Sequence, residues 1–293
     1  MKSACLVIPV GLVVALVAAN SDQDTPSHSK LILSKGVYTE GASFGDVDGD
    51  GVPDLLAGPL WFKGPKYDTQ HRYRPGDATP AKGYKHSSFQ SWVFDANGDG
   101  KLDLYVVNNL GWSDAIEIEC FNYYGEPDYC SPNNYNAPSA DLFYTFGRLG
   151  FTDATLRTGI DAAFGNGLGL AVGDSDLDGD LDVYVANDAT TNLLWVNDGR
   201  AVFEDRGIRA GCGLNGNGTP EAGMGVQFVD LDEDGDLDLY MTHLRRETNT
   251  FYRNRNGKFS DMSNTTGTAG VSMKFTGFGM GFQDFDLDGT LDL

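Results

Sequence analysis

The chain has 293 residues, of which 41% are hydrophobic and 12% aromatic, and its formal net charge is −21. This acidity argues against a nucleic-acid-binding surface, which needs a basic face. The apolar content argues against a disordered chain, because a chain this rich in apolar residues can build a core.

The first 19 residues are typical of a secretory signal peptide. Lys2 supplies a positive charge, 6–19 is an apolar run, and the run ends in small residues that suit cleavage. A membrane-spanning helix needs about 20 apolar residues, so an uncleaved anchor is the less favoured alternative and no transmembrane segment is predicted. We therefore expect a secreted, extracellular protein, or a periplasmic one in a bacterium. Residues 20–33 are interpreted as a linker.

From residue 34 onward one acidic pattern dominates the chain. Asp-x-(Asp or Asn)-x-Asp-Gly-x-x-Asp occurs at 46–54, 95–103, 174–182, 230–238 and 284–292. Its four acidic positions (1, 3, 5 and 9) hold Asp46, Asp48, Asp50, Asp54, Asp95, Asn97, Asp99, Asp103, Asp174, Asp176, Asp178, Asp182, Asp230, Asp232, Asp234, Asp238, Asp284, Asp286, Asp288 and Asp292. Ca²⁺ takes about six to eight oxygen ligands, and glycine at position 6 allows the turn that wraps a loop around it. The pattern therefore predicts about one calcium ion per repeat, with these residues as ligands.

These loops differ from EF-hand loops. An EF-hand needs a bidentate Glu at position 12, where the first four copies have Ala57, Val106, Val185 and Met241. Each of these copies also leads into a short aromatic and β-branched run, which is typical of a strand. We therefore expect each loop to join two strands, with the Asp at position 9 closing the site. Acidic turns without metal are the alternative, and five copies disfavour it.

A second kind of unit follows the loops. It is a hairpin at 141–153, 192–205 and 249–261, made of an aromatic strand, a turn with Gly or Asn and a second strand. Together with the two strands joined by the acidic loop, a full repeat has four strands. The loops begin 49, 79, 56 and 54 residues apart. This period predicts an all-β fold, a β-propeller of four-stranded blades with calcium-binding hairpin loops. We expect the propeller to occupy 34–293 and to be truncated at its C-terminus.

Two segments interrupt the repeats. Residues 63–85 are interpreted as a long loop with a small basic patch at 71–74, for which a solvated loop is the simpler interpretation. An insertion at 110–140 contains Cys120 and Cys130, which could form a local disulfide in an oxidising compartment. Its many aromatic residues suit a recognition surface, and packing on the propeller edge or on the disulfide is an equal alternative. Cys212 has no evident partner.

Several motifs carry a family resemblance. Phe44-Gly45 and Gly58-Pro59 look like an FG-GAP/VCBS repeat, the unit of integrin-α-type β-propellers. Across roughly 88–293, motifs such as Asn187-Asp188 and Glu247-Thr-Asn249 resemble the cartilage acidic protein/ASPIC-UnbV family. The resemblance implies a secreted, calcium-loaded propeller with seven blades in the full-length protein, followed by a small C-terminal domain. In a eukaryotic host, Asn217 and Asn264 would be sites for N-glycosylation.

We expect a secreted calcium-binding propeller that binds extracellular protein or carbohydrate partners, with structural calcium. The alternative is a carbohydrate-active enzyme, lyase-like or dehydratase-like, in which Trp61, Trp92 and Trp112 stack on sugars. No catalytic motif supports it, because the histidines lack metal-ligand spacing and no nucleophile motif is present. A packing or surface role is the simpler interpretation of His243. A structural spacer within a larger protein is a third hypothesis.

Overall fold

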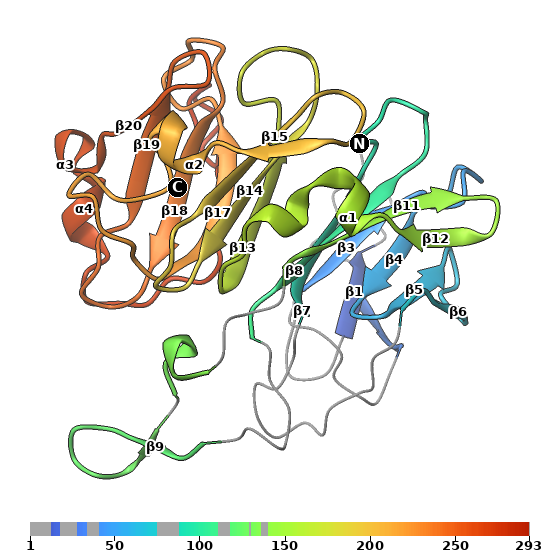
Figure 1. Cartoon of the computed structure of the whole chain (residues 1–293), viewed down its shortest axis with the longest axis horizontal. Coiled ribbons are helices and arrows are strands. Elements are labelled where there is room, and N and C mark those ends of the chain that lie inside the picture. The colour runs from blue at the N-terminus through green and yellow to red at the C-terminus, as the bar shows by residue number, and fades with distance from the viewer. Residues whose placement is uncertain are drawn as a thin grey trace.

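The computed structural model describes residues 13–17, 28–33, 41–74, 88–110, 118–128, 130–135 and 140–292. They form four antiparallel sheets of four strands each, two smaller two-stranded ribbons and a few short helices (Figure 1). This confirms the predicted all-β fold with four-stranded, propeller-like blades.

We call the four sheets blades 1 to 4, and each places its strands in chain order from one edge to the other. Blade 1 contains β3 (Ala42–Gly45), β4 (Asp54–Ala57), β5 (Leu60–Lys63) and β6 (Thr69–Arg72). Blade 2 contains β7 (Ser88–Phe94), β8 (Asp103–Asn108), β11 (Leu142–Gly147) and β12 (Gly150–Asp153). Blade 3 contains β13 (Gly167–Gly173), β14 (Asp182–Asn187), β15 (Leu193–Asn197) and β16 (Phe203–Asp205). Blade 4 contains β17 (Gly223–Val229), β18 (Asp238–His243), β19 (Thr250–Asn254) and β20 (Phe259–Asp261).

The first strands of the blades lie next to one another in the order β3, β7, β13, β17. The second strands β8, β14 and β18 are buried along their whole length. β8 and β14 are covered on both faces by neighbouring blades, whereas β18 packs on blade 3 and meets Phe282 through Tyr240. This burial explains their nearly continuous apolar and aromatic sequences.

Three hydrophobic cores fill the spaces between neighbouring blades. Leu56 and Trp61 of blade 1 pack with Tyr144 of blade 2. The second core joins blades 2 and 3 through Tyr105, Phe143, Val185, Trp195 and Phe203. The third joins blades 3 and 4 through Tyr184, Leu194, Met241, Tyr252 and Phe259. Each large side chain that is removed from water contributes about 1.5–3 kcal/mol, so the blades stabilise one another.

A short helix follows the last strand of blades 2, 3 and 4. These helices are α1 (Thr155–Thr158), α2 (Gly207–Ala210) and α3 (Ser263–Thr266), and each is followed by a glycine with a positive φ angle. In blade 3 the Asp205 carboxylate accepts a hydrogen bond of 2.9 Å from the Gly207 N–H. Asp153 and Asp261 make the same bond in the other two blades. The repeated Phe-x-Asp motif therefore ends each blade.

The structure corrects the interpretation of 63–85 as one long loop. Within that segment, β6 pairs with β5 as the exposed edge strand of blade 1. Its sequence Thr-Gln-His-Arg lacks alternating apolar residues, because neither of its faces is buried, and so gives no strand signal. Residues 75–85 lie outside the described residues.

The N-terminal segments contain two paired strands. β1 (Val13–Val17) lies within the predicted signal peptide and pairs antiparallel with β2 (His28–Ile32), which lies within the predicted linker. The rest of 1–27 lies outside the described residues, so the signal peptide and the localisation stay predictions. None of the helices in the described part of the chain is both long and apolar enough to span a bilayer.

The insertion forms a small ribbon that extends away from the blades (Figure 1). β9 (Cys120–Phe121) pairs with β10 (Pro127–Asp128), the turn η2 (Pro132–Asn134) follows, and Cys120 and Cys130 form a disulfide. Tyr123 and Tyr124 are 97% and 83% exposed. The alternative that these rings pack on the propeller edge is therefore wrong for them, while Tyr129 lies outside the described residues. Cys212 is a buried free thiol.

Candidate functional site

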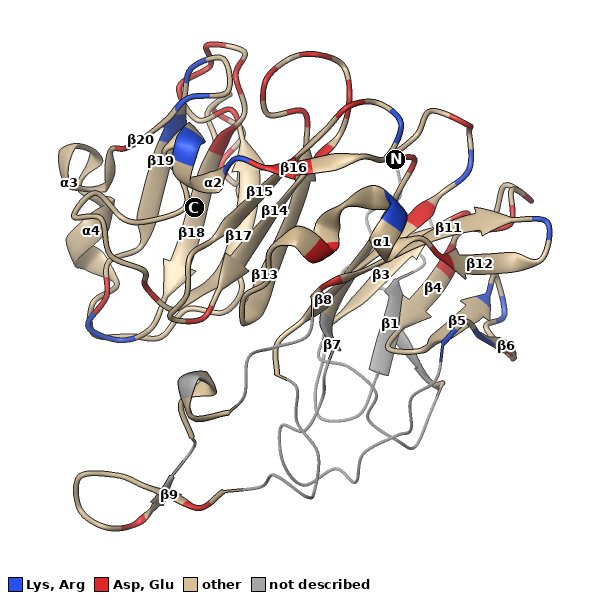
Figure 2. Cartoon of the chain, viewed as in Figure 1, with Lys and Arg blue, Asp and Glu red and all other residues tan. Residues whose placement is uncertain are grey.

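Each of the first four acidic loops joins the first and second strands of its blade, as predicted. The loops 46–54, 95–103, 174–182 and 230–238 lead into β4, β8, β14 and β18. Figure 2 shows acidic residues in the loops along the upper edge of the blades. The fifth loop, 284–292, is closed by paired backbone hydrogen bonds between Gln283 and Asp292.

The aspartate at position 1 folds the loop around its own carboxylate. Asp230 accepts hydrogen bonds from the N–H groups of Asp234 (3.1 Å) and Gly235 (3.0 Å). The glycine at position 6 has a positive φ angle in all five copies, including 93° at Gly235. This confirms that glycine at position 6 allows the turn of the loop, since other residues rarely adopt a positive φ angle.

The aspartate at position 9 is buried and holds the loop to the third strand of its blade. Asp54, Asp103, Asp182 and Asp238 are each no more than 1% exposed. Asp238 accepts hydrogen bonds from the N–H of Leu231 in its loop (3.1 Å) and from the N–H of Asn254 at the end of β19 (2.8 Å). Burial raises the pKa of Asp103 and of Asp182 to about 6. Because each carboxylate oxygen has two lone pairs, these bonds leave room for a cation as well.

Four of the loops bring three carboxylates together. Carboxylate oxygens lie within 4.8 Å of one another in the groups Asp46/Asp48/Asp50, Asp174/Asp176/Asp182, Asp230/Asp232/Asp234 and Asp284/Asp286/Asp292. The loop 95–103 has Asn97, an amide oxygen, at the third position. Carboxylates this close repel one another unless a positive charge lies among them, and an all-oxygen donor set suits a hard cation such as Ca²⁺. The residues present therefore fit the predicted ion.

Basic side chains already neutralise part of this charge. The Lys63 ammonium pairs with Asp48 and, at 2.7 Å, with Asp50. These hydrogen bonds raise the pKa of Lys63 well above its usual range and lower that of Asp50. In blade 4, Arg255 lies 3.4 Å from Asp234. A cation that enters the loops must compete with these side chains.

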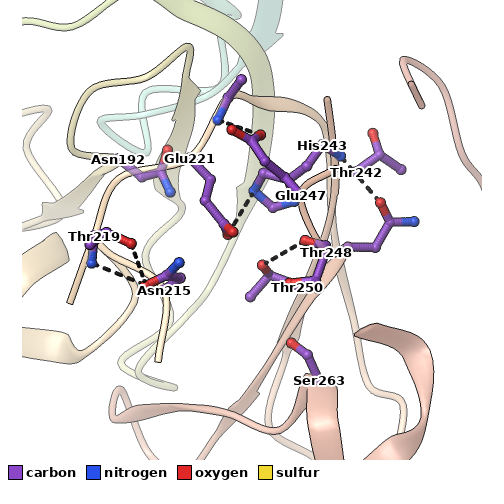
Figure 3. Close-up of polar contacts among 12 residues, drawn as sticks. Asn192, Asn215, Thr219, Glu221, Thr242, His243, Glu247, Thr248, Thr250 and Ser263 are labelled. Carbon is purple, nitrogen blue, oxygen red and sulfur yellow. Dashed lines mark hydrogen bonds and ion pairs between the residues drawn. The ribbon is translucent and has the colours of Figure 1, made fainter. Parts of the chain in front are cut away.

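A polar cluster lies at the opposite end of blade 4, where β18 ends (Figure 3). His243 is 2% exposed, and its Nε2 lies 3.8 Å from a carboxylate oxygen of Glu221. Burial lowers the pKa of His243 to about 4, so the imidazole is neutral at pH 7. Nearby, Glu247 accepts a hydrogen bond of 3.0 Å from the Ala222 N–H, and burial raises the pKa of Asp188 to about 6.

No sequence pattern linked His243 to the acidic residues around it. Glu221, Glu247 and Asp188 come from different connections and meet only in the fold. The family-like motifs could have pointed to this cluster, because Asn187-Asp188 and Glu247-Thr-Asn249 contain two of its three acidic residues.

The aromatic residues proposed as sugar platforms are arranged differently. Trp92 is 46% exposed, whereas Trp61 is only 9% exposed. His71 covers the Trp61 ring, with the two ring centres 4.4 Å apart. Trp112 and His86 lie outside the described residues.

Comparison with known proteins identifies the repeats. Residues 174–241 and 230–293 each match the family of the FG-GAP-like repeat. The chain contains FG-GAP-like repeats. Each match begins on the first aspartate of an acidic loop, so an FG-GAP-like repeat runs from one loop to the next. No curated protein matches the chain in sequence.

Three solved structures are similar to the chain at low sequence identity. Rhamnogalacturonan lyase YesW has a TM-score of 0.37 and 15% identity, with 86% of this chain and 59% of that chain covered. The exotype rhamnogalacturonan lyase YesX has a TM-score of 0.32 and 16% identity, with 86% and 57% covered. Rhamnogalacturonan lyase PL11 of Bacillus licheniformis has a TM-score of 0.31 and 14% identity, with 86% and 59% covered. This chain thus spans less than two thirds of the length of each of them.

Proposed function

We propose that this protein is a secreted, calcium-stabilised propeller that acts by binding extracellular protein or carbohydrate partners rather than by catalysis. The convergence of three carboxylates in each of four loops is the observation that carries the calcium part of the proposal. The FG-GAP-like repeats, each of which starts on such a loop, support it.

The ions have a structural role in this proposal. Positions 1, 3, 5 and 9 of each loop would hold one ion, which supplies the positive charge that the carboxylates lack. In blade 4, position 9 is also hydrogen-bonded to the end of β19. An ion bound there would therefore fix the relation between the first three strands of the blade. In this proposal the ion holds these strands in place and takes no part in a reaction.

Two features support binding outside the cell. The disulfide between Cys120 and Cys130 suits an oxidising compartment. The ribbon that it closes exposes Phe121, Tyr123 and Tyr124, and aromatic residues are enriched among the residues that dominate binding energy in interfaces. A binding role also agrees with the lack of a catalytic motif in the sequence.

Calcium titration by calorimetry with parallel thermal melts tests this proposal. We expect several sites with a Kd in the range of about 10⁻⁶–10⁻³ M and a melting temperature that rises as they fill. A site filled to about 100 times its Kd stabilises the fold by about 2.7 kcal/mol. Addition of EDTA should reverse the rise. Melts that are the same in calcium and in EDTA would refute a structural role for the ion.

A further inference from the structure

The junctions between blades are not built alike. In blade 3, the Asn197 side chain donates a hydrogen bond of 2.8 Å to the carbonyl of Ala96 in the loop of blade 2. In blade 4, Asn254 makes the same bond to Ser175 in the loop of blade 3. We call each of these an asparagine strap, because it holds one blade to the acidic loop of the preceding blade.

Blade 2 lacks an asparagine strap. Asn197 pairs with Phe203 and Asn254 pairs with Phe259, whereas the corresponding pair in blade 2 is Phe146 with Phe151. Phe146 has no side-chain amide with which to reach the loop of blade 1. The junction between blades 1 and 2 is therefore not closed by this hydrogen bond.

A cleft lies at this unstrapped junction. Its cavity of about 500 Å³ is lined by Asp48, Trp61, His71, Arg72, Tyr73 and the segment 146–151. Between blades 3 and 4, the cavity at the corresponding place is lined by Ser175, Asp176, Leu194, Val196, Arg206, Ala210 and 256–258 and measures only about 110 Å³. Ligand sites usually measure about 300–1,000 Å³, so only the first of these two cavities has the volume of a ligand site.

Aromatic rings form much of the cleft. His71 lies exposed on β6 and stacks on Trp61, and Phe146 meets Trp61 edge to face at 6.0 Å. Phe151 lies 5.1 Å from Phe146, with the rings nearly perpendicular. The faces of such rings carry negative charge density, which attracts polarised C–H groups. They therefore suit a flat ligand that presents C–H groups, such as a pyranose ring.

The charge of the cleft is opposite to that of the protein. Arg148 lines it, and its one acidic residue, Asp48, is paired with Lys63. Arg72 lies on the opposite face of β6 from His71, because side chains alternate along a strand. Arg148 is exposed and makes no hydrogen bond or ion pair with any residue in the described part of the chain. In a chain with a net charge of −21, an arginine without a partner among these residues and beside aromatic rings indicates a ligand with a carboxylate, which a guanidinium group binds through two parallel hydrogen bonds.

We propose that the cleft between blades 1 and 2 binds an acidic saccharide. A uronate carboxylate pairs with Arg148, and the sugar ring packs against His71 and Phe151. The inference rests on the proposed binding function, because it assigns that function a site and a class of ligand.

Calorimetry with the full chain in calcium tests the inference. The probe is tetragalacturonate, because its methyl ester offers an uncharged ligand of nearly the same shape. We expect tetragalacturonate to bind, the ester to bind at least tenfold more weakly, and Arg148→Gln and His71→Ala each to raise the Kd at least tenfold. Arg200→Gln is the matched control, because Arg200 is 81% exposed on the corresponding hairpin of blade 3. It should leave the Kd unchanged.

Three results would overturn the inference: no binding of tetragalacturonate, equal binding of its ester, or an unchanged Kd in both cleft variants. Equal binding of tetraglutamate would assign the cleft to acidic peptides instead and would also overturn it. A calcium-dependent melt in the same samples separates this failure from failure of the proposed calcium role. If calcium raises the melting temperature and the saccharide does not bind, only the assignment of this cleft is wrong.

Discussion

The side chain of Asn254 donates a hydrogen bond of 2.8 Å to the backbone carbonyl of Ser175, which lies 79 residues earlier in the chain. The backbone N–H of Asn254 donates at 2.8 Å to the buried carboxylate of Asp238. The N–H of Ser175 in turn donates to Asp182 at 3.0 Å. One asparagine thus connects the acidic loops of two neighbouring blades.

Asn254→Leu should destabilise the protein strongly. Asn254 is fully buried, and its side-chain amide also donates to the carbonyl of Leu237. Leucine has a similar size but would leave both carbonyls without this donor, and a buried unsatisfied polar group costs about 1–3 kcal/mol. We expect the free energy of unfolding to fall by about 3 kcal/mol in urea titrations monitored by tryptophan fluorescence.

Lys258→Ala is the control for this variant. Lys258 is exposed on the same hairpin, so its loss should change the free energy of unfolding by no more than about 0.5 kcal/mol. Equal stability of Asn254→Leu and Lys258→Ala would show that the asparagine strap contributes nothing to stability.

Lys63→Met should have opposite effects with and without calcium. The Lys63 ammonium neutralises Asp48 and Asp50 in the first loop. Without calcium, its removal leaves the loop carboxylates to repel one another, and the melting temperature in EDTA should fall. With calcium, the ion no longer has to displace the ammonium, so the affinity of one site should increase several-fold in calorimetry.

Lys101→Met provides the comparison for Lys63→Met. Lys101 lies 3.8 Å from Asp99 in the second loop and is 54% exposed, so its ion pair is weaker and both effects should be smaller. If Lys63→Met lowered the affinity for calcium, the ammonium would not be a competitor of the ion.

The sequence predicted the features that depend on residues close together in the chain. Glycine at position 6 predicted the turn of each loop, because the turn needs a positive φ angle. Runs of apolar residues such as 104–107 predicted the buried strands after the loops. The structural role of position 9 was not predicted. The spacing marked Asp238 as a ligand, but its hydrogen bond to the N–H of Asn254 depends on how the third strand returns to the loop.

Contacts between blades could not be predicted from the sequence. Asn197 lies 101 residues from Ala96, to which it donates, and no local pattern connects the two. The cleft between blades 1 and 2 likewise depends on Phe146 standing where blades 3 and 4 have asparagine, which only the strand register reveals. The acidic neighbours of His243 were missed for the same reason.

Asp141→Asn should change how stability depends on pH. Asp141 is buried, accepts hydrogen bonds from the Tyr105 hydroxyl (2.7 Å) and the Asn108 N–H (2.8 Å), and has its pKa raised by burial from 3.8 to about 7. The folded state then binds this proton more readily than the unfolded state. The stability that Asp141 contributes is thus fully present below about pH 4 and is lost as the pH rises towards 7.

Asparagine has no proton to lose, and Asn192 and Asn249 occupy the corresponding positions in blades 3 and 4. We expect Asp141→Asn to match the wild type near pH 4 and to exceed it by about 2–4 kcal/mol above pH 7, since one pKa unit corresponds to about 1.4 kcal/mol. Urea unfolding at pH 4, 5.5 and 7.5 measures this difference. Asp161→Asn, an exposed control, should show none. A difference that is constant with pH would contradict the assignment to this carboxyl.

Asp232→Asn and Asp238→Asn should separate the two roles of the acidic loops. Asp232 at position 3 is exposed and lies within 4.8 Å of the other carboxylates of its loop. Its neutralisation should weaken calcium binding at one site at least tenfold, because a charged ligand is lost. In EDTA it should leave the melting temperature nearly unchanged, because the relief of repulsion between like charges is offset by the loss of its ion pairs with Arg253 (3.7 Å) and Arg255 (3.8 Å).

Asp238→Asn should instead destabilise the protein even in EDTA. Both oxygens of Asp238 accept backbone N–H groups, from Leu231 and Asn254, whereas an asparagine amide offers one acceptor and turns its NH₂ donor towards the other N–H. A buried donor left unpaired costs about 1–3 kcal/mol, so the free energy of unfolding in EDTA should fall by about that amount. If Asp238→Asn lost only calcium affinity and no stability in EDTA, position 9 would be a ligand alone. The acidic loops would then depend on the ion, rather than on their own hydrogen bonds, to hold the third strand.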